Sequence, residues 1–111
     1  MADSKYIDLE AGLPRLANNE ALYKKLVAKF GGSINMEAFD AAVSASDYAQ
    51  LSEIVHAAKG VAGNLSLAAF YDNSVELMDQ LRGGGTPAAE NIGAFKSLYY
   101  ETVQAIDDYL A

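Results

Sequence analysis

The fold is decided by residues 51–65, which read LSEIVHAAKGVAGNL and contain the only histidine of the chain, His56. Apolar residues recur there at the i, i+3, i+4, i+7 spacing that gives a helix one buried stripe. They are Leu51, Ile54, Val55, Ala58, Val61, Ala62 and Leu65. At about 100° per residue, His56 falls roughly 160° from the centre of that stripe. The pattern therefore predicts an amphipathic helix whose histidine points out of the core.

Two glycines follow the histidine on the outer side of this helix. Gly60 and Gly63 come one and two turns after His56, where a bulky side chain would crowd the ring. Each glycine inside a helix lowers the stability of that helix by about 1 kcal/mol relative to alanine. Open space for the imidazole is one explanation of that cost. Close approach of another helix is the alternative, above all for Gly63, which lies nearer the next turn.

Composition limits the class of protein. A chain of 111 residues that is 51% hydrophobic suits one domain with an ample core. The net charge of −7 argues against nucleic acid or an anionic membrane as partner, and with the core it favours a monomer. The sequence contains no run of about 18 apolar residues, so it predicts no membrane-spanning helix. The first residues do not resemble a signal peptide. We therefore expect a cytoplasmic protein, and the absence of cysteine excludes disulfides and thiolate chemistry.

The remaining sequence predicts helices and no strand, because helix-forming residues recur at helical spacing and alternating β-branched runs are absent. Six segments are expected: Leu9 to Ala17, one ending at Phe30, one ending at Ala45, the histidine helix to Asn64, Leu67 to Arg82, and one from Thr86-Pro87 to Leu110. The expected caps are Asp8, Asn18 or Asn19, Ser33 or Asn35, Ser46 or Asp47, Ser66, and Thr86 with Pro87 at the first helical position.

Several residues are expected to interrupt or flank these helices. Gly12 and Pro14 weaken the first segment, since proline removes a backbone hydrogen bond. Gly31-Gly32 is expected to end the second segment through the left-handed conformation that glycine accepts. In the segment from Leu67 to Arg82, Asn73 is expected on the outer face.

The connections between the later segments are short, and short connections force antiparallel neighbours. We therefore expect an all-α fold, an antiparallel up-down four-helix bundle over about residues 33–111. One or two additional short helices, over about residues 8–31, should pack on one end or side. The whole chain, residues 1–111, is expected to be a single domain.

A single exposed histidine restricts the chemistry. General base catalysis needs an orienting carboxylate and a pocket, and a metal site needs several ligands, so no metal is expected. A nucleophile that accepts a phosphoryl group needs an unprotonated imidazole nitrogen, room, and a cation to offset the new negative charge. Lys59 lies on the same side of the helix as His56, and Gly60 leaves room. The site therefore fits phosphorylation better than hydrolysis.

These residues resemble a known family. HAAKG, from His56 to Gly60, is similar to the H-x-x-K-G core of histidine-containing phosphotransfer (HPt) domains of bacterial two-component phosphorelays. Gly63, Asn64 and Leu65 continue the match, as do LMDQLRGG and the opening YIDLEAGLPRLANNEALYKKLVAKF. The resemblance covers nearly the whole chain.

The resemblance implies a four-helix bundle whose histidine accepts a phosphoryl group from a receiver-domain aspartate and passes it to another receiver. By resemblance His56 is phosphorylated, Lys59 stabilises the phosphorylated state, and Gly60, with Gly63, keeps the site accessible. The implied partners are receiver (response regulator) domains and a hybrid sensor histidine kinase. The chain would carry no cofactor of its own, because the Mg²⁺ belongs to the receiver. It would be a carrier without a nucleotide site or independent catalytic activity, either free-standing or a piece of a larger kinase.

Two further expectations concern the surroundings of His56. The receiver should dock on the exposed faces of the histidine helix and the next helix, centred on Ser52, Glu53, Lys59, Gly60 and Gly63. In some family members a polar side chain, often glutamine, on the next helix orients the imidazole. Met78 occupies that position here, with Gln80 two residues further, and a thioether cannot orient a ring nitrogen by a strong hydrogen bond.

Other functions stay open beside the carrier. His56 could be an ordinary surface histidine and Lys59 a solvated helix lysine, in which case the bundle is an interaction module that binds receivers or other signalling partners without phosphorylation. A metal- or haem-binding bundle suits one histidine and three methionines poorly. A hydrolase lacks a triad-like arrangement near His56.

Overall fold

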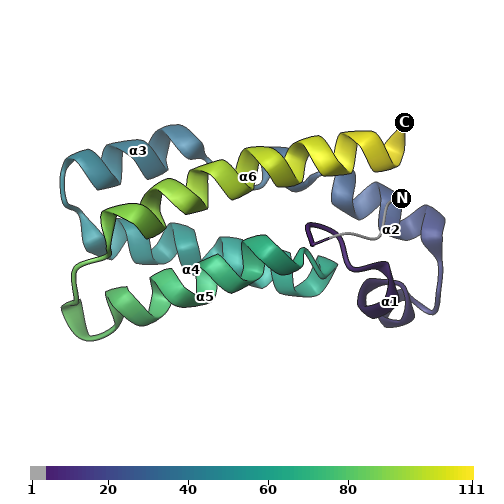
Figure 1. Ribbon diagram of the computed structural model, residues 1–111, viewed down its shortest axis with the longest axis horizontal. Helices are drawn as coiled ribbons and strands as arrows, with labels where there is room; N and C mark the ends of the chain where they lie inside the picture. Colours follow the sequence, from purple (N-terminus) through teal and green to yellow (C-terminus); the bar gives the residue numbers. More distant parts are fainter. Residues whose placement is uncertain (1–4) are drawn as a thin grey trace.

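A computed structural model describes residues 5–111, which are helical and contain no strand (Figure 1). The helices are α1 (Leu9–Gly12), α2 (Glu20–Ala28), α3 (Met36–Ser44), α4 (Tyr48–Leu65), α5 (Ala68–Leu81) and α6 (Ala89–Leu110). Single 3₁₀ turns lie at Pro14–Leu16, Phe30–Gly32 and Arg82–Gly84. The all-helical class expected from the sequence is confirmed.

The longest helices pack side by side along a molecule of 40 × 23 × 19 Å (Figure 1). Helices α4 and α5 form an antiparallel hairpin, α6 packs along α5, and α3 packs on α4. Helix α3 lies beside the first half of α6, where Asp40 and Lys96 pair at 2.9 Å. Helix α2 lies beside the second half, where the Tyr109 hydroxyl donates to Glu20 at 2.7 Å. Helix α1 lies beyond the α4–α5 turn (Figure 1).

Aromatic side chains join these elements in the core. Phe70 of α5 lies 4.8 Å from Phe95 of α6 and 5.4 Å from Phe30, as measured between ring centroids. Phe95 also stacks on Phe39 of α3 at 4.6 Å. All four rings are at most 1% exposed. One continuous aromatic cluster therefore connects α3, α5, α6 and the Phe30–Gly32 turn.

Four of the expected helix caps are confirmed. The side chains of Asp8, Asn19, Asn35 and Asp47 each accept a hydrogen bond from a backbone N–H three residues later, at 3.0–3.2 Å. Each such cap contributes about 1 kcal/mol to helix stability. The structure thereby selects Asn19, Asn35 and Asp47 from the pairs that the sequence left open.

Two expected caps are wrong. Ser66 adopts the left-handed conformation that ends α4 (φ 56°), so it does not cap α5. Thr86 does not cap α6, which begins later, after Ala88. Pro87 is buried ahead of the helix, and the Ala88 N–H donates to the Gln80 side chain at 2.8 Å. Gln80 of α5 thus pairs the backbone N–H just before α6, and α6 has no side-chain cap of its own.

Three further expectations are corrected. Helix α1 ends at Gly12, because Pro14 permits only a 3₁₀ turn after it. Gly31 and Gly32 do not end α2 in the left-handed conformation; they continue the chain as a 3₁₀ turn. Asn73 is 7% exposed rather than on the outer face, and its amide donates to the Asn91 carbonyl of α6 at 3.4 Å.

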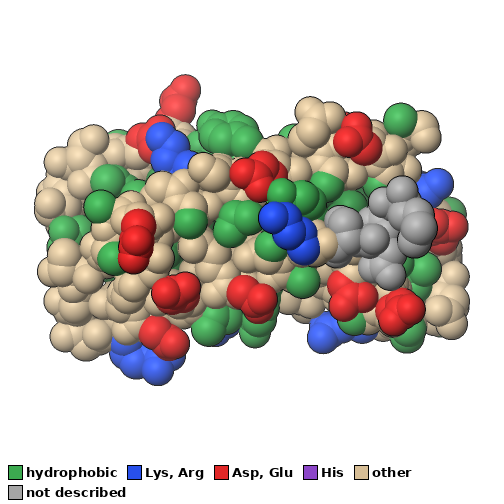
Figure 2. Space-filling model, viewed as in Figure 1, with side chains coloured by type: hydrophobic (Ala, Val, Ile, Leu, Met, Phe, Trp, Pro, Cys, Tyr) green, Lys and Arg blue, Asp and Glu red, His purple; other side chains and the backbone are tan. Residues whose placement is uncertain are grey.

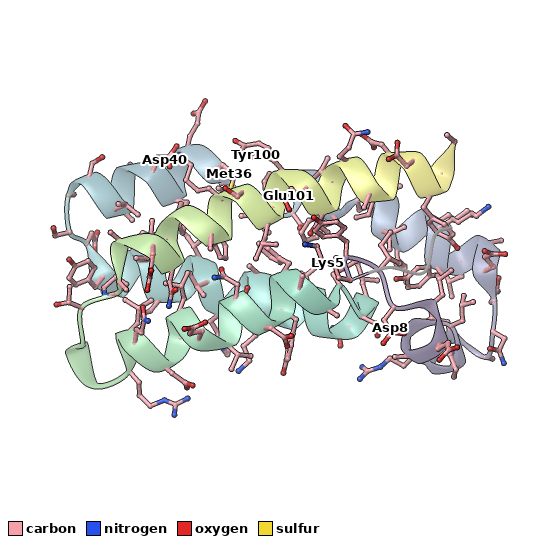
Figure 3. The ribbon with its side chains drawn as sticks, viewed as in Figure 1. Lys5, Asp8, Met36, Asp40, Tyr100 and Glu101 are labelled. Carbon is pink, nitrogen blue, oxygen red and sulfur yellow. The ribbon has the colours of Figure 1, made fainter. Side chains whose placement is uncertain are left out.

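The segment before α1 holds the α4–α5 turn. The Ala69 N–H donates to the Lys5 carbonyl at 2.9 Å, and the Asp8 N–H donates to the Ser66 carbonyl at 3.0 Å. The Tyr23 hydroxyl donates to the Leu65 carbonyl at 2.5 Å. Helix α5 has no side-chain cap, so backbone groups from the start of the chain satisfy the turn instead. Figure 3 shows Lys5 and Asp8 where this segment meets the hairpin.

The buried phenol of Tyr23 is expected to make the folded chain less stable at high pH. Burial, and then the charge of Asp8, raises the pKa of its phenol to about 12. The proton is therefore held more tightly in the folded chain than in the unfolded chain, where the phenol has its ordinary pKa of about 10. The stabilisation is complete below about pH 10 and is lost as the pH rises toward 12, by about 2–3 kcal/mol. Burial raises the pKa of Tyr109 in the same direction.

Urea unfolding at pH 9 and at pH 11.5 checks this prediction, with Tyr23→Phe as the control. The variant should be less stable than wild type at pH 9, because it leaves the Leu65 carbonyl unpaired. It should also lose less stability between the two pH values. An equal loss in both proteins would contradict the role of Tyr23.

Candidate functional site

His56 lies in the middle of α4 on its exposed side, as the sequence predicts. The opposite side of the helix is buried through Leu51, Val55, Ala58, Ala62 and Leu65. Within residues 5–111 His56 makes no hydrogen bond or ion pair. The face drawn in Figure 2 shows no histidine. The imidazole is thus held at the surface with both ring nitrogens available.

Lys59 and Gly60 follow His56 on the next turn of α4. Lys59 is half-buried, and it has no ion pair with any residue that the structure describes. A Cβ atom added at Gly60 would meet no atom within 4 Å. The helix surface beside the histidine is therefore open, and a free ammonium group is carried on the same turn.

Gly63 lies in a different environment. A Cβ atom there would lie 3.1 Å from the Tyr71 ring of α5, closer than nearly all real contacts of that kind. Close helix packing alone accounts for this glycine, which was the alternative left open by the sequence. Its role in access to His56 stays a prediction.

The two glycines should respond differently to alanine. Gly60→Ala is expected to stabilise the chain by about 1 kcal/mol, since alanine favours helix and the space is open. Gly63→Ala should gain less or destabilise, because its methyl group pushes on the Tyr71 ring. Urea unfolding of both variants measures the difference, and a larger gain at Gly63 would contradict it.

The contact between Gly63 and Tyr71 also sets the register of the hairpin. In antiparallel helices it places Met78, two turns beyond Tyr71, level with His56. Met78 is half-buried and packs against the core. Gln80 is committed to the Ala88 N–H of the α5–α6 connection. Neither residue hydrogen-bonds the imidazole, so the ring is not oriented from α5.

The remaining predicted docking residues border the histidine on its N-terminal side. Ser52 is half-buried and Glu53 is exposed, one turn before His56. Across the hairpin, α5 exposes Asp72, Glu76 and Asp79. The predicted docking residues therefore follow one another along α4, and of these carboxylates Asp72 lies near Lys59 and Gly60, since it lines the same pocket.

A groove of about 510 Å³ begins beside Lys59 and Gly60. Its other wall is formed by the N-terminal segment, through Asp8, Ala11 and Arg15. The sequence did not single out Arg15, and it held no signal that could have done so. Arg15 joins Lys59 only because the N-terminal segment folds back onto the α4–α5 turn.

Residues 5–111 hold no group of three or more His, Cys, Asp or Glu side chains that could bind a metal ion. None of the described helices is long and apolar enough to cross a membrane.

Comparison of the chain with protein-family models, with curated proteins and with solved structures gave no match in any of the three.

Proposed function

We propose that this chain is a histidine phosphotransfer protein of the HPt type, which accepts a phosphoryl group on His56 from a receiver-domain aspartate and passes it to another receiver. The observation that carries the proposal is the exposed, unpartnered imidazole on α4 with a free lysine and an open glycine on the following turn. An accessible nucleophile, a nearby cation and room for an incoming group are what the transfer requires.

The proposed step needs no group beyond the two proteins and the receiver's Mg²⁺. The lone pair of an unprotonated ring nitrogen attacks the phosphorus of the aspartyl phosphate. A nitrogen–phosphorus bond forms while the bond between phosphorus and the aspartyl oxygen breaks, and the carboxylate leaves with the electron pair. The other ring nitrogen keeps its proton, which solvent can later remove. The Lys59 ammonium group offsets charge on the transferred group.

The proposed architecture for this role is an antiparallel four-helix bundle made by α3, α4, α5 and α6, with α1 and α2 as additional N-terminal helices in one domain. The antiparallel α4–α5 hairpin and the shared aromatic cluster of α3, α5 and α6 support it. Such a bundle displays His56 on a rigid helix rather than on a loop. A rigid display suits a residue that two different receivers must reach in turn.

Reversing the charge of Lys59 should slow the transfer more than it lowers stability. Lys59→Glu places a carboxylate beside the phosphoryl site and repels the incoming group. We expect at least a tenfold slower transfer, whereas the free energy of unfolding should change by about 0.5 kcal/mol or less. Lys29→Glu is the matched control, because Lys29 is an exposed lysine after α2 with the same charge change. Equal transfer rates for Lys59→Glu and Lys29→Glu would rule out this role.

The experiment that tests the proposal is transfer from a ³²P-labelled receiver domain, with Mg²⁺, to the intact chain. Acid-labile, base-stable label on the chain is the expected result for phosphohistidine. Several receivers are tried, and their binding is measured in parallel by calorimetry. Binding without label from any receiver would favour the alternative, an interaction module that is not phosphorylated.

A further inference from the structure

The groove beside Lys59 and Gly60 brings together two parts of the chain that are distant in sequence. One wall is the C-terminal half of α4, and the other is the segment that includes Asp8, Ala11 and Arg15. Its floor is made of small residues such as Ala62 and Gly63, with Tyr71 at one side. At about 510 Å³ it can hold several side chains of a bound segment. It is continuous with the surface around His56, because Lys59 and Gly60 belong to both.

Arg15 and Lys59 are the two cations of this groove, and both are free. Neither has an ion pair, a hydrogen bond or a ring contact within residues 5–111. Elsewhere, Lys5 and Lys24 lie over tyrosine rings, Arg82 pairs with Asp79 and Lys96 pairs with Asp40, whereas Lys25 and Lys29, both on or next to α2, are unpaired within residues 5–111. Two free cations from different elements are therefore gathered at one site of a chain with net charge −7.

Two carboxylates also line the groove. Asp8 is half-buried, and its side chain accepts the Ala11 N–H as the cap of α1, so the helix start offsets part of its charge. Asp72 is exposed on α5. Neither carboxylate pairs with Arg15 or Lys59. The cations thus remain free to meet an acidic group, and Asp72 would oppose it.

The wall that carries Arg15 is fixed to the rest of the molecule. The backbone bonds from Lys5 to Ala69 and from Asp8 to Ser66 tie the segment before α1 to the hairpin, and Ile7 between them is fully buried. Gly12 of α1 also packs closely against α2, since a Cβ atom added at Gly12 would lie 3.0 Å from the Tyr23 ring. The groove is therefore preformed, which limits the cost of ordering it on binding.

We infer that this groove is a docking site for an acidic segment of the receiver domain, with Arg15 as the residue that meets a carboxylate of the partner. The inference rests on the proposed function, because it assumes that a receiver approaches His56. It extends the predicted docking surface from α4 onto the N-terminal segment. The charge complementarity of two free cations with an acidic segment is what selects this occupant.

The test measures the affinity of the receiver that labels His56, using calorimetry on the intact chain. Arg15→Gln should weaken binding about fivefold, and Asp72→Asn should tighten it about twofold, because one change removes an attraction and the other a repulsion. Arg15→Lys should restore part of the loss. Arg82→Gln is the control, since Arg82 is exposed but pairs with Asp79 at the end of α5, and it should leave affinity unchanged.

The outcomes separate this inference from the proposed function. Opposite changes in affinity for Arg15→Gln and Asp72→Asn, with His56 still labelled, support the acidic segment. Unchanged affinity in both variants, or changes of the reverse sign, would overturn the inference. The proposed phosphotransfer function would still stand in that case, provided that His56 is labelled. If no receiver labels wild-type His56, the proposed function fails, and this inference fails with it.

Discussion

Replacing His56 with glutamine is expected to abolish phosphoryl acceptance from every receiver that labels the wild-type chain. The chain has no second histidine and no cysteine, so no other side chain offers a neutral nitrogen or sulfur nucleophile of this kind. The rate of phosphoryl acceptance should fall by more than about a thousandfold, and the detection of residual label sets the limit of this measurement. Phosphoryl transfer on gel-separated proteins provides the measurement.

The same substitution should leave the fold almost unchanged. His56 is exposed and has no hydrogen bond among the described residues, so its removal leaves no buried group without a partner. We expect the free energy of unfolding to stay within about 0.5 kcal/mol of wild type. Receiver binding should persist, since the docking surface is intact. Label of equal intensity on His56→Gln would place the phosphoryl group elsewhere and remove His56 from the mechanism.

The largest effect on stability is expected for Phe70→Ala. The Phe70 ring is fully buried and contacts Phe30, Phe95 and Tyr99, so it joins α5 to α6 and to the turn after α2. Removing it costs the transfer free energy of the ring and leaves a cavity, together about 3–5 kcal/mol. That loss is a large part of the roughly 5–15 kcal/mol of a typical domain. Urea unfolding followed by circular dichroism measures it.

A milder variant keeps this prediction testable if the alanine variant does not fold. Phe70→Leu retains most of the apolar volume and should cost about 1–2 kcal/mol. Leu22→Ala is the control, because Leu22 is 38% exposed and should cost less than either. A loss below about 1 kcal/mol for Phe70→Ala would mean that the aromatic cluster does not hold these elements together.

The helices were largely predictable because their signals are local. The periodic apolar residues of α4 and α6, and caps such as Asp47, act within a few residues, so the sequence alone reveals them. The exposure of His56 followed from the same periodicity. Where a cap came from a distant element, prediction failed. Ser66 and Thr86 looked like caps, but the Lys5 carbonyl pairs an N–H at the start of α5, and the Gln80 side chain pairs the N–H just before α6.

The site was predictable only in its α4 part, for the same reason. His56, Lys59 and Gly60 lie on consecutive turns of one helix, so their spacing indicates that they share a face. Arg15 reaches the groove through tertiary folding, and no local pattern encodes that approach. Gly63 shows that helical spacing does not reveal contacts with another helix. Its spacing from His56 suggested a role in access to the histidine, whereas its close contact is the Tyr71 ring of α5.

The most direct measurement is onward transfer from the phosphorylated chain. The chain is labelled by one ³²P-receiver, separated from it, and mixed with a second, unlabelled receiver and Mg²⁺. We expect the label to leave the chain and appear on the receiver aspartate, and we expect no such transfer when the acceptor aspartate is replaced by asparagine. Label that stays on the chain, or is lost only to water, would contradict the proposal that His56 carries phosphoryl groups between receivers.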